Sequence, residues 1–219
     1  GKEFAVFAGR LHGQLQKLSE TNLHGKLNGA VGNFNALHIA YPKTNWLNFS
    51  EKFILSLGLI PNLTTTQINT YEDLIEYLQI IQRINGILLD VDLDMWRYIS
   101  DHYFLQEVKK DEVGSSTMPQ KVNPILFENS EGNIGVANSL IEYMTRKLPV
   151  SRLQRDLSDS TTIRNIGSIL GYSFLAATAT LDGMLRVKPN LPIIEQELNK
   201  DWSILAEAVQ TMLRKDGVA

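Results

Sequence analysis

Apolar residues recur at helical spacing along most of the chain. The clearest case is a stripe between residues 74 and 98, whose members are spaced alternately three and four apart. The stripe consists of Leu74, Tyr77, Ile81, Ile84, Leu88, Val91, Met95 and Tyr98. A helix over residues 72–106 would be about 50 Å long at 1.5 Å per residue. Such a rod cannot bury its stripe inside a small monomer, so the pattern predicts partner helices from this chain or from other copies.

Two further long helices are predicted. One runs from Pro124 to about Lys147, with Asn123 as its N-cap and the proline in its first turn. The other begins at Ser158 or Asp159, runs to about residue 187, and is stopped by the prolines that follow at 189 and 192. Its apolar stripe would be Ile163, Ile166, Leu170, Phe174, Ala177, Leu181 and Met184.

The rest of the chain reads as shorter helices and turns. Helices are predicted over 2–20, 46–57, 192–199 and 202–215, with Gly217 closing the last. Turn-rich segments are 25–33, 59–70, 107–122 and 148–157. No segment shows the alternation of a strand. The sequence therefore predicts an all-α fold, a bundle of long helices.

Composition narrows the class of protein. The chain is 43% hydrophobic and 21% charged, which is ordinary for a soluble globular protein. A net charge of −3 gives no general attraction to nucleic acid, and no run of about 18 apolar residues predicts a membrane span. The absence of cysteine excludes disulfides and fits a reducing, cytoplasmic compartment. The start at Gly1, without Met or leader, indicates a piece of a longer polypeptide.

The segment 114–128 carries most of the chemistry. It reads Gly-Ser-Ser-Thr-Met-Pro-Gln-Lys-Val-Asn-Pro-Ile-Leu-Phe-Glu. The glycine frees the backbone, two hydroxyls and a lysine follow, and the Asn-Pro pair can open a helix. That order can bring together an oxyanion-binding backbone, a proton-transferring hydroxyl and a fixed cation.

This segment closely resembles the signature loop of the fumarase/aspartase superfamily, whose enzymes eliminate fumarate from a substituted succinate. The resemblance implies that Ser115 is the base that removes the proton next to a carboxylate. A hydroxyl is a weak base, so its alkoxide needs stabilisation. Lys121 and the positive end of the helix that opens at Asn123 are the local candidates.

The same resemblance assigns the neighbouring positions. Ser116 and the backbone amides of Thr117 and Met118 would bind a substrate carboxylate, with Lys121 and Asn123 alongside. Glu128, one turn into the helix, matches the carboxylate that orients a catalytic histidine in the superfamily. The catalytic set is therefore Ser115, Lys121 and Glu128.

The substrate must be sought elsewhere, and segment 148–164 is the best discriminator. It holds Arg152, Arg155 and Arg164, with hydroxyl residues at an expected helix start. Arginine forks and a helix N-terminus suit a phosphate, which indicates a nucleotide-bearing substrate. The alternative is a capped helix with solvated arginines, paired to Asp156 and Asp159 at little energetic gain.

Segment 148–164 resembles the phosphate-binding region of the adenylosuccinate lyase family, in its bacterial form. Gly25–Asn33 and Thr64–Gln67 also resemble that family, and the likeness extends along essentially the whole chain. The glycines of the first of these segments could equally mark a tight turn where helices approach closely. The resemblance implies that the following residues contact the substrate: Gln67, Lys121, Asn123, Arg155, Ser160, Thr161 and Arg164.

The resemblance implies β-elimination of fumarate from adenylosuccinate, giving AMP, and from succinylaminoimidazole carboxamide ribotide (SAICAR), giving AICAR. No organic cofactor is needed, because the substrate's own carboxylate accepts the electrons. The family is homotetrameric and builds each site from three subunits. Residues 1–219 would be its central helical domain, with a C-terminal domain starting near 190–219.

Two family motifs are missing from the chain, including the Thr-His-Gly-Gln-like motif of the general-acid histidine, so the chain alone is expected to be inactive. None of its histidines has metal-ligand spacing, so no metal is predicted. Two alternatives stay open. One is another fumarate-releasing lyase, such as an argininosuccinate lyase or an aspartase. The other is a non-catalytic helical scaffold that oligomerises.

Overall fold

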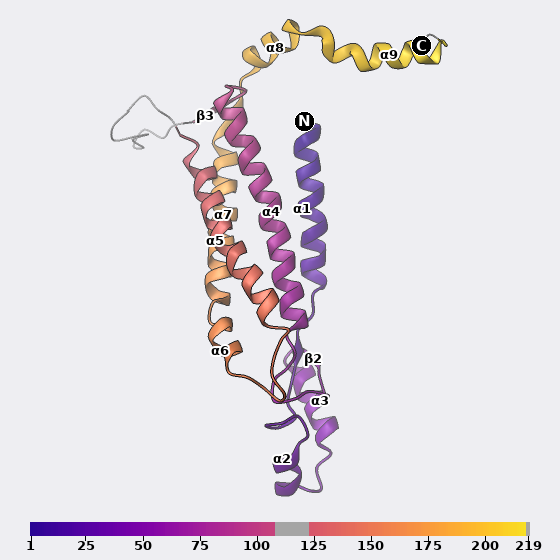
Figure 1. The fold of residues 1–219 in the computed structure, drawn as a ribbon, viewed down its shortest axis with the longest axis vertical. Helices are drawn as coiled ribbons and strands as arrows, with labels where there is room; N and C mark the ends of the chain where they lie inside the picture. Colours follow the sequence, from indigo (N-terminus) through magenta and orange to yellow (C-terminus); the bar gives the residue numbers. More distant parts are fainter. Residues whose placement is uncertain (108–122, 218–219) are drawn as a thin grey trace, which may run out of the picture.

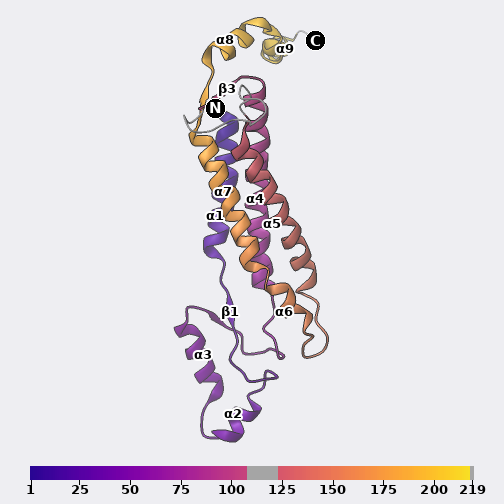
Figure 2. The same cartoon turned by 90° about the vertical axis from the view of Figure 1, so that its left-hand side faces the viewer.

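Four helices form an elongated bundle in the computed structural model, which describes residues 1–107 and 123–217. They are α1 (Lys2–Glu20), α4 (Glu72–Ser100), α5 (Ile125–Lys147) and α7 (Ile166–Leu185). α5 packs on both α4 and α7, and α1 packs on α4 (Figures 1 and 2). The predicted all-α bundle is confirmed. None of the described helices combines the length and apolarity needed to cross a membrane.

The core runs along α4 in three clusters. The one nearest the start of α4 contains Leu78, Ile141, Met144, Leu148 and Ile169. The middle cluster contains Leu88, Ile134 and Ala176, and the third contains Val91, Met95 and Phe127. All eight members of the predicted α4 stripe lie in these clusters or pack against them. The heptad pattern therefore identified the buried face of α4.

α4 ends six residues before the predicted end. His102 takes a left-handed φ of 63°, and the Tyr103 N–H donates to Tyr98 O at 2.9 Å, which closes the helix in a Schellman motif. Beyond it, β3 (Phe104–Gln106) pairs antiparallel with β4 (Val187–Pro189). A second pair, β1 (His24–Gly25) with β2 (Ile60–Pro61), is parallel. The expectation of no strand was wrong here, because pieces of two or three residues are too short to show alternation.

The single helix predicted from 158 to 187 is in fact two helices. α6 (Ser158–Ile163) has Arg164 as its C-cap, and α7 starts at Ile166. The Asn165 side chain lies at the break and donates to Thr162 O at 3.1 Å, so it takes a carbonyl at the end of α6.

The predicted stripe of α7 was also wrong in part. Phe174 and Leu181 are 73% and 59% exposed. The buried side of α7 consists of Ile169, Ser173, Ala176, Ala179, Thr180 and Gly183. Small residues face α5 because the two helices approach closely: a Cβ added at Gly183 would lie 2.8 Å from Phe127 Cζ. Several larger apolar side chains of α7, among them Phe174, Leu181 and Leu185, lie on the surface.

Polar side chains cross the bundle in two buried layers. In one, the Thr180 hydroxyl donates to Asp92 Oδ1 at 2.7 Å and lies 2.8 Å from the Ser130 hydroxyl. Asp92 is 1% exposed, and its Oδ2 has no hydrogen-bond partner among the described residues. Burial raises the pKa of Asp92 to about 6. In the other layer, Asn85 Nδ2 donates to Ser173 Oγ at 2.9 Å and to Asn138 Oδ1 at 3.0 Å.

The remaining elements extend from the two ends of the bundle (Figure 1). A small lobe holds α2 (Asn35–Ala40) and α3 (Trp46–Ser56); α2 was not predicted. An arm at the other end holds α8 (Leu191–Lys200), the 3-10 helix η1 (Trp202–Leu205) and α9 (Ala206–Lys215). The helices predicted over 2–20, 46–57, 192–199 and 202–215 are confirmed to within about a turn, η1 supplying the first turn of the last.

Candidate functional site

The predicted site residues lie at the two ends of the bundle. One group lies on or beside α6 and in the loop that leads into α4, and it consists of Gln67, Arg155, Ser160, Thr161 and Arg164. Asn123 and Glu128 lie at the opposite end, where α5 begins (Figures 1 and 2). The two groups are separated by the length of α5, about 35 Å for its 23 residues. A single chain therefore does not bring the described residues of the predicted site together.

Asp159 is the centre of the group at the α6 end. It is 4% exposed and accepts a hydrogen bond from the Tyr71 hydroxyl on Oδ2 at 2.7 Å. Its other oxygen, Oδ1, lies 3.5 Å from an Arg155 guanidinium nitrogen. Burial, together with the hydrogen bond to Asp159, raises the pKa of Tyr71 to about 12. The carboxylate thus ties α6 to the start of α4 and fixes one edge of the arginine.

The Arg155 guanidinium keeps part of its donor capacity. Its Nε is buried and has no hydrogen-bond partner among the described residues. A buried unpaired donor on a charged group is costly, and an anion would satisfy it. The alternative interpretation, in which the arginines are solvated and pair with nearby aspartates, predicted an ion pair with Asp159. That ion pair is present as well. Because Asp159 occupies only part of the Arg155 guanidinium, the arrangement is compatible with both phosphate binding and a simple ion pair.

The other residues of this group surround the start and end of α6. The Ser160 hydroxyl donates to Leu157 O at 2.8 Å, while Thr161 and Arg164 are exposed. α6 begins at Ser158, as predicted, but its first N–H is capped by Asp156 Oδ1 at 2.9 Å. The Ser158 hydroxyl also donates to Asp156 Oδ1, and this hydrogen bond, with that from the backbone N–H, lowers the pKa of Asp156. The hydroxyls therefore do not cap α6, and Thr161 and Arg164 point to solvent.

The two loop segments singled out in the sequence lie against each other. Asn28 is fully buried, and its Nδ2 donates to Thr65 Oγ1 at 2.8 Å. Gly32 has φ +84°, and a Cβ there would lie 2.0 Å from Thr65 O. The close approach proposed for these glycines is therefore to a helix at Gly25, where a Cβ would lie 2.9 Å from Ile54 Cγ2 of α3, and to the 64–66 loop at Gly32. This contact holds the backbone that carries the exposed Gln67.

At the other end, Glu128 lies in the first turn of α5, as predicted. Its Oε1 accepts a hydrogen bond from Trp96 Nε1 at 3.1 Å. The carbonyl of Asn123 accepts from Gln106 Nε2 at 3.3 Å, which ties the start of α5 to β3. The predicted N-cap was wrong: Pro124 occupies the cap position of α5 and Asn123 precedes it.

Four of the predicted site residues lie outside the described part of the chain. They are Ser115, Ser116, Met118 and Lys121. Two further residues were not predicted from the sequence: Tyr71, which contacts the Arg155 partner Asp159, and Trp96, which contacts Glu128. Both make contacts far apart in sequence, and no local pattern signals such a contact.

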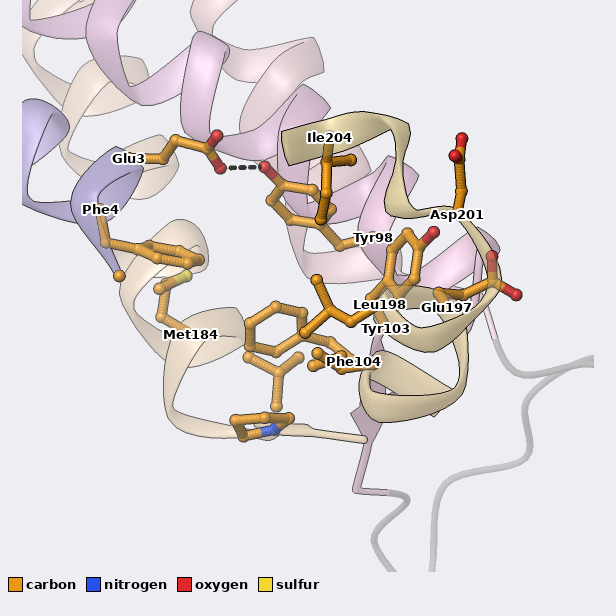
Figure 3. Close-up of a pocket in the computed structure, with 14 residues that line it drawn as sticks. Glu3, Phe4, Tyr98, Tyr103, Phe104, Met184, Glu197, Leu198, Asp201 and Ile204 are labelled. Carbon is orange, nitrogen blue, oxygen red and sulfur yellow. Dashed lines mark hydrogen bonds between the residues drawn. The ribbon is translucent and has the colours of Figure 1, made fainter. Parts of the chain in front are cut away.

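A separate cavity of about 810 Å³ lies between the bundle end and the C-terminal arm (Figure 3). Its lining is mainly apolar and includes Phe4, Phe104, Met184 and Leu198. Tyr98 donates to Glu3 Oε2 at 2.7 Å at its edge, which raises the pKa of the tyrosine to about 12. None of the predicted site residues within 1–107 and 123–217 lines this cavity. Among the described residues, no group of three or more His, Asp or Glu could hold a metal ion.

Comparison with known proteins identifies relatives over the whole chain. The family model described as "Lyase" matches residues 1–138, and the model described as "Adenylosuccinate lyase C-terminal" matches residues 151–219. Curated relatives named adenylosuccinate lyase come from Buchnera aphidicola subsp. Baizongia pistaciae (46% identical), Haemophilus influenzae (47%) and Escherichia coli K12 (46%). Each alignment covers 100% of this chain and 47–48% of the relative. The chain thus spans about half the length of the curated relatives it matches.

A solved structure shares the fold. The 3-carboxy-cis,cis-muconate lactonizing enzyme from Pseudomonas putida superposes with a TM-score of 0.70 at 19% sequence identity. The match covers 94% of this chain and 45% of that one. At this identity the likeness supports the bundle architecture alone.

Proposed function

We propose that this chain is part of an adenylosuccinate lyase. The premise is that the chain belongs to the lyase family, whose model matches residues 1–138. The full protein would eliminate fumarate from adenylosuccinate, giving AMP, and from SAICAR, giving AICAR. The observation that carries the proposal is that relatives of this name align over the whole chain at 46–47% identity. Residues 1–219 would be the central helical domain, with the C-terminal domain starting where the arm leaves the bundle, near residue 190.

The elimination would be carried out at the end where α5 begins. Ser115 would take the Cβ proton, and Lys121 would stabilise the charge that develops on the substrate carboxylate. Ser116, Met118 and Asn123 would bind that carboxylate, and Glu128 would orient the general-acid histidine supplied by another part of the protein. No cofactor is required, because the carboxylate next to the reacting carbon accepts the electron pair as an aci-acid.

The substrate's phosphate would bind at the α6 end. Arg155 supports this role, because its guanidinium is held by Asp159 on one edge and its buried Nε has no partner in the part of the chain that the structure describes. Arg164 and Thr161 are exposed beside it, and Ser160 and Gln67 complete the proposed set. A small nucleotide with a dianionic phosphate suits these donors.

Assembly would bring the two ends together. Since α5 separates them by about 35 Å in one chain, a complete site needs the α6 end of one copy and the α5 start of another. The exposed apolar side chains of α7, which include Phe174, Leu181 and Leu185, support packing against other copies. We propose a homotetramer of the kind the family resemblance implies, located in the cytoplasm.

The assignment of the base is tested by Ser115→Ala in the full-length protein. Turnover of adenylosuccinate should fall to background while the substrate still binds, because only proton abstraction is lost. Binding is measured by isothermal titration and turnover by the absorbance of the purine. Unchanged kcat would refute the role of Ser115.

The phosphate end is tested by Arg164→Leu, with Arg152→Leu as its matched control on an exposed arginine of the same segment. We expect Arg164→Leu to raise the KM for adenylosuccinate about tenfold or more, by loss of a charge-assisted hydrogen bond. With the dephosphorylated substrate, succinyladenosine, the two variants should behave alike. Equal KM values for adenylosuccinate in both variants would remove the phosphate argument.

A further inference from the structure

The indole of Trp96 contacts Glu128 across the interface of α4 and α5. Trp96 Nε1 donates to Glu128 Oε1 at 3.1 Å, between residues 32 positions apart. Trp96 lies near the end of α4, and Glu128 lies in the first turn of α5. The contact therefore joins a helix that carries no predicted catalytic residue to one that carries a predicted catalytic carboxylate.

The core fixes the backbone on both sides of this hydrogen bond. Met95 and Phe127, the residues directly before Trp96 and Glu128, are 0% and 2% exposed and belong to one buried cluster. Phe127 also packs against the bare Cα of Gly183 on α7. Because neither backbone can shift without disturbing the cluster, the two partners are held at a set separation.

The chemistry of the donor suits the role of Glu128. A glutamate side chain has three rotatable bonds, and a carboxylate that orients an imidazole must present one oxygen in a fixed direction. The indole N–H is a donor only and is always neutral. It can therefore hold Oε1 without cancelling the negative charge, which leaves Oε2 for an N–H of histidine.

We propose that Trp96 is a positioning residue for the elimination, and that it acts by fixing the rotamer of Glu128. The inference rests on the proposed function, in which Glu128 orients the general-acid histidine. Trp96 itself does not touch the substrate in this account. Its loss should therefore affect the chemical step more than substrate binding.

The test is Trp96→Phe in the full-length protein, with Trp46→Phe as its matched control. Trp46 also donates its indole N–H, to Tyr41 O at 3.3 Å, but it lies in the α2–α3 lobe. We expect Trp96→Phe to lower kcat for adenylosuccinate about tenfold or more, with KM changed less than about twofold. Trp46→Phe should leave both constants unchanged. Circular dichroism melting of each variant verifies folding.

A double-mutant cycle separates positioning from general support. In a Glu128→Gln background, Trp96→Phe should cause no further loss of kcat, because its effect passes through the carboxylate. A wild-type kcat in Trp96→Phe would overturn the inference, and so would an undiminished loss in the Glu128→Gln background. If Glu128→Gln itself keeps the wild-type kcat, the role of Glu128 in the proposed function fails, and the positioning role fails with it. A wild-type protein with no turnover of adenylosuccinate refutes the proposed function directly.

Discussion

The Tyr71 hydroxyl donates a hydrogen bond to Asp159 Oδ2 at 2.7 Å, across 88 positions of the sequence. Tyr71 is the residue that precedes α4, and Asp159 lies in α6. The second oxygen of the same carboxylate pairs with Arg155. The orientation of the proposed phosphate-binding arginine therefore depends on a residue of a distant loop.

Replacing Tyr71 by phenylalanine should weaken substrate binding. The change leaves a buried carboxylate oxygen without its donor, so we expect a loss of about 1–3 kcal/mol in the free energy of unfolding. Arg155 would be held less firmly, which should raise the KM for adenylosuccinate several-fold and leave kcat nearly unchanged. Tyr143→Phe, on an exposed ring of α5, is the control. A variant with the KM and stability of the control would show that Asp159 positions Arg155 without help from Tyr71.

The contact between the two loops predicts unequal costs for two glycine substitutions. Gly32 and Gly58 both have positive φ, +84° and +74°, so alanine at either position pays about 1–2 kcal/mol in backbone strain. At Gly58 nothing lies within 4 Å of the added Cβ, whereas at Gly32 the Cβ would lie 2.0 Å from Thr65 O. Urea unfolding should therefore show Gly32→Ala as clearly the more destabilising. Equal losses in the two variants would mean that the 64–66 loop moves aside freely.

The buried Asp92 makes the stability of the bundle depend on pH. Its pKa is about 6 in the folded chain against an ordinary value of 3.8, so the folded state binds the proton more tightly. The contribution of Asp92 to stability is fully present below about pH 4 and is lost as pH rises through about 6. The loss amounts to about 3 kcal/mol, at 1.36 kcal/mol per pKa unit.

Asp92→Asn tests this dependence, because the amide keeps the shape of the carboxyl group and cannot ionise. The free energy of unfolding in urea should fall in the wild type relative to Asp92→Asn as pH rises from 4 to 8. The difference between the two proteins should level off above about pH 7. Asp182→Asn, on α7, serves as the control substitution. Two parallel stability profiles for the wild type and Asp92→Asn would contradict the burial of a titrating carboxyl group at this position.

The sequence predicted the bundle well because α4 carries its apolar residues on one regular stripe. It failed on α7, where the small residues Ser173, Ala176 and Gly183 form the packed side and Phe174 lies outside. Apolar periodicity identifies the faces of a helix that can be buried, and α7 carries apolar residues on more than one face. The break between α6 and α7 was missed because the stripe continues across it.

The candidate site could be proposed from the sequence only where a local motif carries the chemistry. The order of residues in 114–128 and the arginines of 148–164 are such motifs. Their separation by the length of α5 depends on the path of the chain, and so do the contacts of Tyr71 and Trp96. No spacing within a short window encodes these relations.

The most direct test is complementation between two impaired variants of the full-length protein, assayed at an adenylosuccinate concentration well below the KM of Arg164→Leu. Glu128→Gln should impair the α5 end and Arg164→Leu should weaken binding at the α6 end, and the two ends of one chain lie about 35 Å apart. When the variants are mixed, dissociated and reassembled, sites that combine an intact end from each chain should restore about a quarter of the wild-type turnover at an equal ratio. If mass spectrometry shows mixed oligomers and turnover stays at the level of the separate variants, the site is not shared between chains and the central claim is wrong.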